Sequence, residues 1–368
     1  MVRKPEIEVI GAGCAGLGLA AAIAEAGLGQ VRLVTKEMPA QRADHIWGFW
    51  GDESLEPAMR LARHHWSSWQ ISDETHTITH HSTDHAYHAL QASHWLAACQ
   101  TRLEAQDGSR LICQDDISAD ITATIRFDSR PPQLPNNVLY QHFLGQYVMS
   151  DRPVFTPDCA ILMDFRCDQS LGMHFLYLLP FSETEALVES TLFTDEIASD
   201  SYYREAIAGY LSRFYQTASF TITGEEKGAL PLCEIAPNPK PSEIAIGARG
   251  GALRPSSGYG FVFIQRHIGQ LVSHYQKTGR WQSRAPHSPL QLWMDRVFLR
   301  VIEGQSPDLP SYFVGLAAQL DGAAFARFMS GKARWRDLAK VVWAMPPYPF
   351  VKAALSLLWR PARKGWVE

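Results

Sequence analysis

Three glycines near the start of the chain have the spacing of a phosphate-binding turn. Gly11, Gly13 and Gly16 follow the pattern G-x-G-x-x-G, with Cys14 and Ala15 inside it. An apolar strand precedes the motif, and an alanine-rich helix of roughly ten residues follows it. In this context the first glycine allows a tight turn, the second lets backbone approach a pyrophosphate, and the third lets the helix pack on the strand. Because a helix N-terminus attracts anions, these five residues predict a dinucleotide site rather than a purely structural turn.

The carboxylate that would hold the ribose of such a nucleotide is not in its usual place. Residues 30–35 are expected to form the second parallel strand, which ends on an acidic residue in dinucleotide folds. Thr35 or Lys36 occupies that place, and the nearest carboxylate is Glu37. Glu37 is therefore either a cofactor-binding residue at the ribose or a solvated glutamate in a loop.

A second glycine-rich loop, from Gly247 to Gly260, occurs late in the chain. Residues 244–267 repeat the order of strand, loop and helix, with the helix beginning near Gly258. Such a loop, returning to the first nucleotide-binding unit, can present N–H groups to the ribityl phosphate and the isoalloxazine ring of a flavin. The two glycine loops together favour a flavin over a nicotinamide cofactor.

Residues 44–52 form an expected loop that is unusually aromatic. The loop carries His45, Trp47 and Phe49 around a glycine. Loops of this composition line a cofactor or an apolar substrate, or else they pack into the core. We include the three side chains as candidate substrate-binding residues.

Composition excludes several classes of function. The chain has 368 residues and a net charge of −4, so its length predicts about two domains and its charge gives no reason to expect nucleic acid. Six scattered cysteines without a C-x-x-C pair suit a reducing cytosol. Five histidines within residues 76–88 lack the spacing and the partners of a metal site, so no metal is expected. We expect neither a secretory leader nor a membrane-spanning helix.

The second half of the chain predicts a sheet followed by helices. Residues 143–149, 160–165, 174–180 and 185–193 are expected strands joined by turns rich in Asp, Ser, Gly and Pro. Strands that succeed one another without intervening helices favour an antiparallel sheet in a domain of its own. Residues 201–215 predict a helix, and the chain beyond Leu290 predicts further helices.

The C-terminal end is strongly basic. Between Gly331 and Trp366 there are eight Lys and Arg residues against one acid, Asp337. Residues 351–359 are apolar and stand next to aromatic and basic residues. This segment fits either the interface of a membrane or a packing helix at the edge of the fold.

The order of the motifs resembles that of the bacterial lycopene β-cyclases, flavoproteins of carotenoid biosynthesis. Individually the shared motifs are short, but their common order extends over about 330 residues of the chain. They are GAGCAG (11–16), DHIWGFW (44–50), DSR (128–130), FLGQYV (143–148), ILMDF (161–165), LPFSETEALVEST (179–191), GALPL (228–232), RPSSGYGF (254–261) and ARFMSGKARWRDLAKVVWAMPPYP (326–349).

The resemblance implies an α/β fold with two lobes, like that of the flavin hydroxylases. Residues 1–75, 91–140 and 225–290 would form a Rossmann-type FAD-binding lobe. Residues 76–90 and 141–224 would form an antiparallel β-sheet lobe that covers the substrate. Residues 291–368 would be a helical, basic and aromatic region that faces a membrane.

The resemblance also implies the site. Glu189 falls on the acidic residue that the family is held to need for cyclisation, and its role would be catalytic. Two positions differ from the family's pattern. Ser129 replaces the usual glycine of the D-G-R triplet, and the acidic residue that binds the ribose is not at its usual place at the end of the second strand. The residues carried over to the FAD site are Gly11, Gly13, Gly16, Asp128, Arg130, Pro255, Ser257, Gly258 and Tyr259, and Cys14, Ala15, Glu37 and Gly247 join them from the loops described above.

The implied activity is lycopene β-cyclase: acid/base cyclisation of lycopene ψ-ends to β-rings without net redox change. The cofactor would be FAD, active in its reduced form with NADPH as reductant. The partners would be the polyene and a membrane surface, which places the protein in the cytoplasm and peripherally on the membrane. The alternatives are an FAD-dependent reductase or hydroxylase of another isoprenoid and a pigment or flavin carrier.

Overall fold

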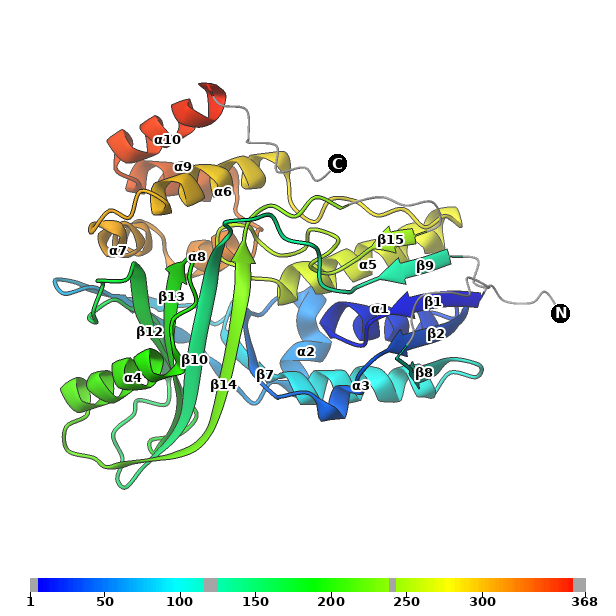
Figure 1. Cartoon of the computed structure of the whole chain (residues 1–368), viewed down its shortest axis with the longest axis horizontal. Helices are drawn as coiled ribbons and strands as arrows, with labels where there is room; N and C mark the ends of the chain where they lie inside the picture. Colours follow the sequence, from blue (N-terminus) through cyan, green and yellow to red (C-terminus); the bar gives the residue numbers. More distant parts are fainter. Residues whose placement is uncertain (1–5, 116–124, 238–242, 360–368) are drawn as a thin grey trace.

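The computed structural model describes residues 6–115, 125–237 and 243–359. Figure 1 shows a nucleotide-type lobe at one end of the long axis and a large sheet at the other. Helices from the end of the chain lie over one end of the large sheet in this view. The first lobe combines β1 with β15, so it contains segments from the start of the chain and from far along it.

The nucleotide-type lobe is built on a parallel sheet of five described strands in the order β15-β9-β1-β2-β8. Its central strand, β1, holds Ile7, Val9 and Ile10 fully buried. Helix α1 packs on β1 and β2 and contacts both α3 and α5. The predicted Rossmann-type unit is thus confirmed. The bounds are β1 Glu6–Ile10, β2 Gln30–Thr35, β8 Arg110–Cys113, β9 Ile125–Asp128, β15 Glu243–Ala245, α1 Cys14–Glu25, α3 Ala92–Glu104 and α5 Phe261–Thr278.

The second lobe is a sheet of seven described strands in the order β14-β10-β13-β12-β11-β5-β6. All neighbours are antiparallel except β5 and β11, which are parallel. Helix α4 covers one face by packing on β10 and β13. The predicted antiparallel sheet is therefore present. The bounds are β5 Ser68–Ser72, β6 Thr77–His81, β10 Leu139–Ser150, β11 Cys159–Asp164, β12 Met173–Pro180, β13 Glu185–Thr194, β14 Phe220–Leu232 and α4 Asp200–Phe214.

Two strands correct the expected boundaries between the lobes. β5 lies in the seven-stranded sheet, although residues 1–75 were expected in the nucleotide lobe. β14 is one strand that pairs with β10 as far as Leu232, although the boundary was expected at residue 225. Gly228 does not end the strand, because it lies against the ring of Phe143, where a Cβ would meet a ring carbon at 2.8 Å. These boundaries are set by the pairing of β5 and β14 with strands that are distant in the sequence, and the local sequence pattern does not indicate that pairing.

A small antiparallel sheet in the order β3-β7-β4 connects the two lobes. The expected aromatic loop at residues 44–52 is wrong in one respect, because Ile46–Trp50 is strand β3, paired with β7. Gly48 is needed there, since a Cβ would meet the hydroxyls of Tyr87 at 2.0 Å and Tyr177 at 2.8 Å. The bounds are β3 Ile46–Trp50, β4 His64–Trp66, β7 Tyr87–Gln91 and the nearby helix α2 Glu56–Leu61.

The chain beyond Leu290 is helical, as predicted. The region begins at a capping box in which the Ser288 hydroxyl accepts from the Gln291 N–H, with Pro289 in the first turn. In the described part of the chain no single helix is long and apolar enough to cross a bilayer; α9 and α10 meet that test only as a pair bent by 110°. The bounds are α6 Pro289–Ile302, α7 Leu309–Gln319, α8 Gly322–Met329, α9 Trp335–Ala344 and α10 Pro347–Trp359.

Candidate active site

The first glycine turn leaves the N-terminus of α1 open to a phosphate. Gly13 is the N-cap of α1, with no side-chain cap and no acid in the first turn. A Cβ on Gly16 would meet the Gly11 carbonyl oxygen at 1.8 Å, so only glycine fits there. A Cβ on Gly13 would meet nothing closer than Arg42 at 3.5 Å, so the space above it is free for a ligand. This cradle fits the pyrophosphate of a dinucleotide.

Glu37 follows the end of β2, close to this turn. Its carboxylate is half-exposed and lies 3.6 Å from the Arg42 guanidinium. The Thr35 hydroxyl donates to the Glu37 carbonyl, and Arg42 donates to the same hydroxyl. The side chain is therefore within reach of a nucleotide at α1, and its role at the ribose stays a prediction.

Asp128 ends β9 as a fully buried carboxylate with two cationic partners. It accepts from the Arg130 guanidinium at 2.9 and 2.8 Å, and Arg249 lies 3.4 Å away. Burial raises the pKa of Asp128, but hydrogen bonds from Arg130 and the charges of Arg130 and Arg249 hold it below its ordinary value. Ser129 donates from its hydroxyl to the carbonyls of Ile10 and Gly11. The serine that replaces the family's glycine therefore reinforces the phosphate turn.

The second glycine loop lies against the first turn and the large sheet together. A Cβ on Gly247 would meet the Ala15 side chain at 2.6 Å, and a Cβ on Gly258 would meet Leu230 of β14 at 2.7 Å. Both glycines have positive φ, which other residues rarely adopt. The Ser257 hydroxyl is buried without a hydrogen-bond partner among the described residues. This loop therefore offers a polar group to a ligand between the lobes.

Cys14, Pro255 and Tyr259 lie in the same region. The Cys14 sulfur accepts from Gln265 of α5 at 3.3 Å, and burial raises the pKa of its thiol. Pro255 is buried in the loop. The Tyr259 ring packs edge-on against Trp50, with centroids 6.2 Å apart. The structure thus brings the residues of the two expected cofactor loops together.

The aromatic side chains of β3 lie on its two faces, and both candidates on this strand share one of them. Trp47 stacks on Phe261 of α5 at 5.3 Å, and Phe49 is fully buried against the same ring at 5.0 Å. Both therefore point toward the nucleotide lobe, and Phe49 packs in its core. His45 lies beside Trp47, edge-on at 5.4 Å. Trp50, which was not among the candidates, packs edge-on against Tyr87 at 4.8 Å.

Glu189 lies on β13, on the face of the large sheet away from α4. Side chains alternate along a strand, and Val188 and Leu192 of the opposite face pack under α4. The partly buried carboxyl accepts one hydrogen bond, from the Thr191 hydroxyl at 2.7 Å. Its register partner on β12 is Tyr177, whose hydroxyl is 2.9 Å from that of Tyr87.

The pKa of Glu189 is raised to about 8. Burial is the main cause, the charge of Glu226 adds to it, and the hydrogen bond from Thr191 opposes it. Glu189 is therefore a carboxylic acid that keeps its proton at neutral pH. Such a group can donate a proton to a substrate in an apolar site.

Glu226 on β14 is a second buried carboxyl, which sequence reasoning missed. Burial raises its pKa to about 7, while hydrogen bonds from Tyr147 and the Ile46 N–H oppose the rise. The missing signal was strand pairing: Gly145 of β10 pairs with Glu189 on one side and with Glu226 on the other. The lobe boundary expected at residue 225 falls inside β14 and hid this register.

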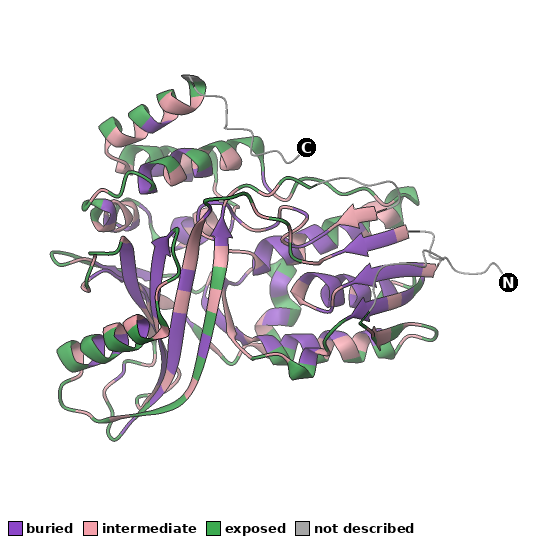
Figure 2. Cartoon of the chain, in the orientation of Figure 1, coloured by how far each residue is buried: buried purple, intermediate pink, exposed green. Residues whose placement is uncertain are grey.

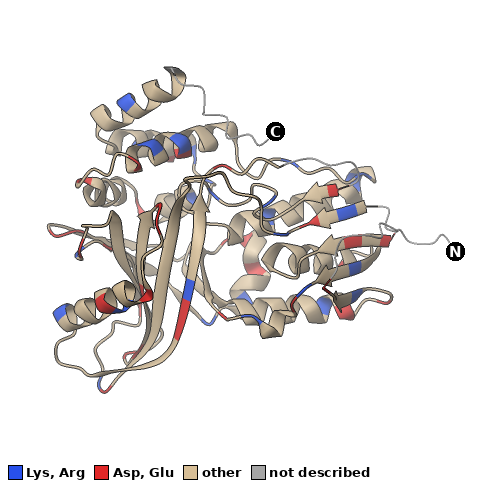
Figure 3. Cartoon of the chain, in the orientation of Figure 1, with Lys and Arg blue, Asp and Glu red and all other residues tan. Residues whose placement is uncertain are grey.

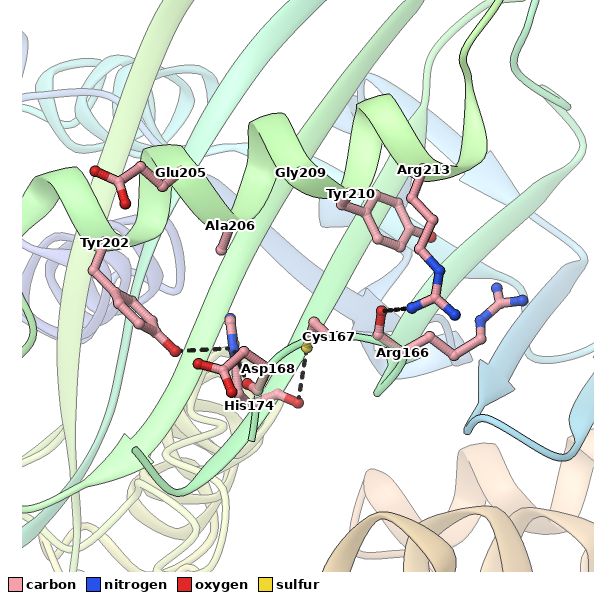
Figure 4. Close-up of a pocket in the computed structure, with 10 residues that line it drawn as sticks. All are labelled: Arg166, Cys167, Asp168, His174, Tyr202, Glu205, Ala206, Gly209, Tyr210 and Arg213. Carbon is pink, nitrogen blue, oxygen red and sulfur yellow. Dashed lines mark hydrogen bonds between the residues drawn. The ribbon is translucent and has the colours of Figure 1, made fainter. Parts of the chain in front are cut away.

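A cavity of about 350 Å³ lies on the other side of the sheet, beneath α4 (Figure 4). Three of its polar groups already have partners: His174 hydrogen-bonds Ser190 at 2.8 Å, and Arg166 and Arg213 pair with Asp164 and Glu74. Ser190 follows Glu189 and points to the opposite face. The cavity is therefore separate from the candidate site.

The histidines of residues 76–88 do not assemble with other ligands. In residues 6–115, 125–237 and 243–359 no group of three or more His, Cys, Asp or Glu side chains could hold a metal ion. His80 is buried against Phe325, and His88 stacks on Phe49. Burial lowers the pKa of both imidazoles.

Comparison with solved structures defines the class of protein first. The fold is that of a geranylgeranyl bacteriochlorophyll reductase-like protein from Thermoplasma acidophilum, with 12% identity, a TM-score of 0.60, and 97% and 99% of the two chains covered. It is also that of p-nitrophenol 4-monooxygenase from Pseudomonas putida, with 12% identity, a TM-score of 0.56, and 97% and 98% covered. The chain therefore has the two-lobed fold that these reductase and monooxygenase structures share.

Sequence comparison gives the family within that class. The family model described as lycopene cyclase protein matches residues 6–355. A lycopene β-cyclase of Pantoea ananas is 25% identical over 366 residues, covering 89% of this chain and 91% of the relative. A second, from a Paracoccus species, is 26% identical over 283 residues, covering 71% and 70%. The chain belongs to the lycopene cyclase family.

Proposed function

We propose that the protein is a lycopene β-cyclase that converts ψ-ends of lycopene to β-rings. The observation that carries this function is Glu189, a carboxylic acid with a pKa raised to about 8 on the inner face of the large sheet. Family membership supplies the substrate class, and a protonated acid beside aromatic side chains suits the addition of a proton to a polyene.

The proposed cofactor is FAD, held with its pyrophosphate at the turn from Gly11 to Gly16. Asp128 and Arg130, Glu37, and the loop containing Gly247, Pro255, Ser257, Gly258 and Tyr259 would bind the rest of it. When bound in its reduced form, with NADPH as the proposed reductant, FAD supplies negative charge beside a carbocation. The open N-terminus of α1 and the unpartnered Ser257 hydroxyl support this assignment.

The chain's own groups account for the proton transfers. Glu189 gives its proton to C2 of the ψ-end, which leaves a cation at C1. The C5=C6 double bond then closes the ring on C1, and loss of a proton from C6 completes it. Tyr87 and Tyr177, whose pKa values burial raises, stay neutral and can face the cation with their rings. His45 and Trp47 remain predicted substrate contacts, whereas Phe49, predicted with them, is enclosed in the core of the nucleotide lobe.

Expression in lycopene-producing bacterial cells, followed by chromatography of the pigments, tests the function. We expect β-carotene or γ-carotene from the wild type and unchanged lycopene from Glu189→Gln with its flavin retained. Glu183→Gln, in the exposed turn before β13, is the matched control and should cyclise normally. Consumption of NADPH or oxygen in proportion to product would instead identify a reductase or hydroxylase.

We also propose that the C-terminal helices bind a membrane surface, from which the enzyme would draw its substrate. Figure 2 shows exposed residues along α10, and Figure 3 shows a basic residue on the same helix. Trp343 is 84% exposed and Tyr348 is 76% exposed. Apolar side chains and cations together favour an anionic lipid surface. Arg360, Arg363 and Lys364 lie outside the described residues.

A further inference from the structure

We infer that Glu226 is a positioning residue that acts with Glu189 as one acid pair, in which Glu226 carries the negative charge and Glu189 carries the proton. This inference rests on the proposed cyclase function and adds a second group to its site. The two acids lie on β13 and β14, which flank β10 in the large sheet, and this part of the sheet is next to β3.

The register of the sheet places the two acids on the same face. Gly145 of β10 is the partner of Glu189 on β13 and of Glu226 on β14. A Cβ on Gly145 would lie 3.4 Å from the Glu226 Cγ and 3.5 Å from the Glu189 Cβ. Register partners point to the same face of a sheet, so Gly145 leaves no side chain between the two acids.

The hydrogen bonds show which acid carries the charge. Glu226 is 5% exposed and accepts from the Tyr147 hydroxyl and from the Ile46 N–H, at 3.1 Å to Oε2 and 3.4 Å to Oε1. Glu189 accepts from Thr191. Donors favour the ionised form of a carboxyl, so the negative charge belongs on Glu226. That charge in turn disfavours ionisation of Glu189.

The other groups that face the pair do not reverse this distribution. Tyr177 on β12 and Tyr87 on β7 are neutral, since burial raises their pKa values. Asp44, just before β3, adds negative charge toward Glu226. The Arg63 guanidinium lies over the Tyr147 ring at 5.9 Å and is paired with Glu185. The order of the two pKa values, about 7 for Glu226 and about 8 for Glu189, agrees with the hydrogen bonds.

The pair accounts for both proton transfers of the cyclisation. Donation from Glu189 to C2 leaves two carboxylates side by side on one face of the sheet. Repulsion between them raises the proton affinity of the pair, which then accepts the proton that leaves C6. Both acids end as they began, and no proton is gained or lost overall.

The test is the pH profile of cyclisation in Glu226→Gln. Glutamine keeps the shape of the side chain and removes its charge, so the pKa of Glu189 should fall. The alkaline limb of the pH profile should then move to lower pH. For each unit by which the pKa of Glu189 falls we expect a loss of kcat of about fivefold at about pH 8, approaching tenfold at higher pH, with a smaller loss at about pH 6, because kcat follows the protonated fraction of Glu189. Glu226→Asp, which restores the charge, should restore much of the limb. An unmoved profile in Glu226→Gln would overturn the inference.

A second readout does not require turnover. Infrared titration of the wild type should show two coupled carboxyl steps, and Glu189→Gln and Glu226→Gln should each show one step below the upper one of the wild type. Glu225→Gln is the control, since Glu225 pairs with Arg204 at 2.7 Å and points to the other face. Two independent steps would refute the pair even in a protein that cyclises lycopene. Coupled steps in a protein that forms no ring would contradict only the proposed function.

Discussion

Gly145 on β10 pairs in register with Glu189 on β13 and leaves the space beside the Glu189 Cβ open. The glycine is thus as much a part of the acid site as the carboxyl itself. It leaves no side chain between Glu189 of β13 and Glu226 of β14.

Gly145→Ala should therefore impair the site while the sheet persists. The new Cβ would lie 3.0 Å from Leu187 Cδ1 and about as close to both acids as ordinary contact allows. We expect a loss of stability of about 1 kcal/mol from overpacking and a fall in kcat of at least several-fold. Gly209→Ala on α4, where a Cβ meets nothing within 4 Å, is the control and should be neutral or slightly stabilising. Equal activity of the two variants would count against an open site at Gly145.

The two later glycines of the phosphate turn should fail in different ways. In Gly16→Ala the Cβ would meet the Gly11 carbonyl at 1.8 Å, so the turn itself must move and the protein should unfold at lower denaturant. In Gly13→Ala the nearest atom is at 3.5 Å, so folding should be normal and only FAD binding should weaken. Denaturation midpoints and flavin absorbance after gel filtration separate the outcomes. Full flavin content in Gly13→Ala would place the pyrophosphate elsewhere.

Asp128 should contribute to stability at neutral pH and lose that contribution in acid. Its folded pKa lies below the ordinary value of 3.8, because Arg130 and Arg249 outweigh burial. The stabilisation is therefore complete above pH 3.8 and disappears as the pH falls through the folded pKa. Asp128→Asn should cost about 1–3 kcal/mol at neutral pH, with a shrinking difference in acid. Asp151→Asn, on an exposed pair, should change little.

The fold was predictable from sequence where one segment carries its own signal. The turn from Gly11 to Gly16, the helix that follows this turn and the strand at residues 30–35 each follow from local pattern, and the structure has them. Four strands of the large sheet, β10, β11, β12 and β13, were also predicted one by one. Their order was not, because pairing between β10 and β14 joins residues about eighty positions apart.

The candidate site was predictable to the same extent. Glu189 and the glycine loops were found from motifs, whereas Glu226 required the register of three strands. Trp47 and Phe49 were identified as aromatic candidates, but only pairing of β3 with β7 shows that they face α5 while Trp50 faces Tyr87. Local sequence gives residue types; which face a residue occupies depends on its strand partners.

Removing Glu189, the proposed catalytic acid, should stabilise the protein at alkaline pH. Glu189 titrates near the ordinary value of 4.5 when unfolded and at about 8 when folded, so the native state holds the extra proton between these values. Wild-type stability should therefore fall as pH rises through this window, and Glu189→Gln should lack that fall. Urea unfolding should show the variant as the more stable protein above about pH 8 and the two as alike near pH 4.5. Glu225→Gln should instead make the protein less stable at neutral and alkaline pH, since the folded pKa of Glu225 is lowered to about 2 and its charged form stabilises the native state.

The surface of α9 and α10 should carry membrane binding through both apolar and charged residues. Trp343 is 84% exposed, and Lys340 on the same helix is half-exposed. Flotation with anionic vesicles should recover the wild type, and binding should weaken with neutral lipid or added salt because each basic residue near the surface contributes about 1 kcal/mol. Trp343→Glu should lower the bound fraction several-fold, whereas Ile197→Glu, which alters a 60% exposed side chain before α4, should bind as the wild type does. Equal flotation of the two variants would move the membrane contact away from these helices, and the proposed route of the polyene into the site would have to begin elsewhere.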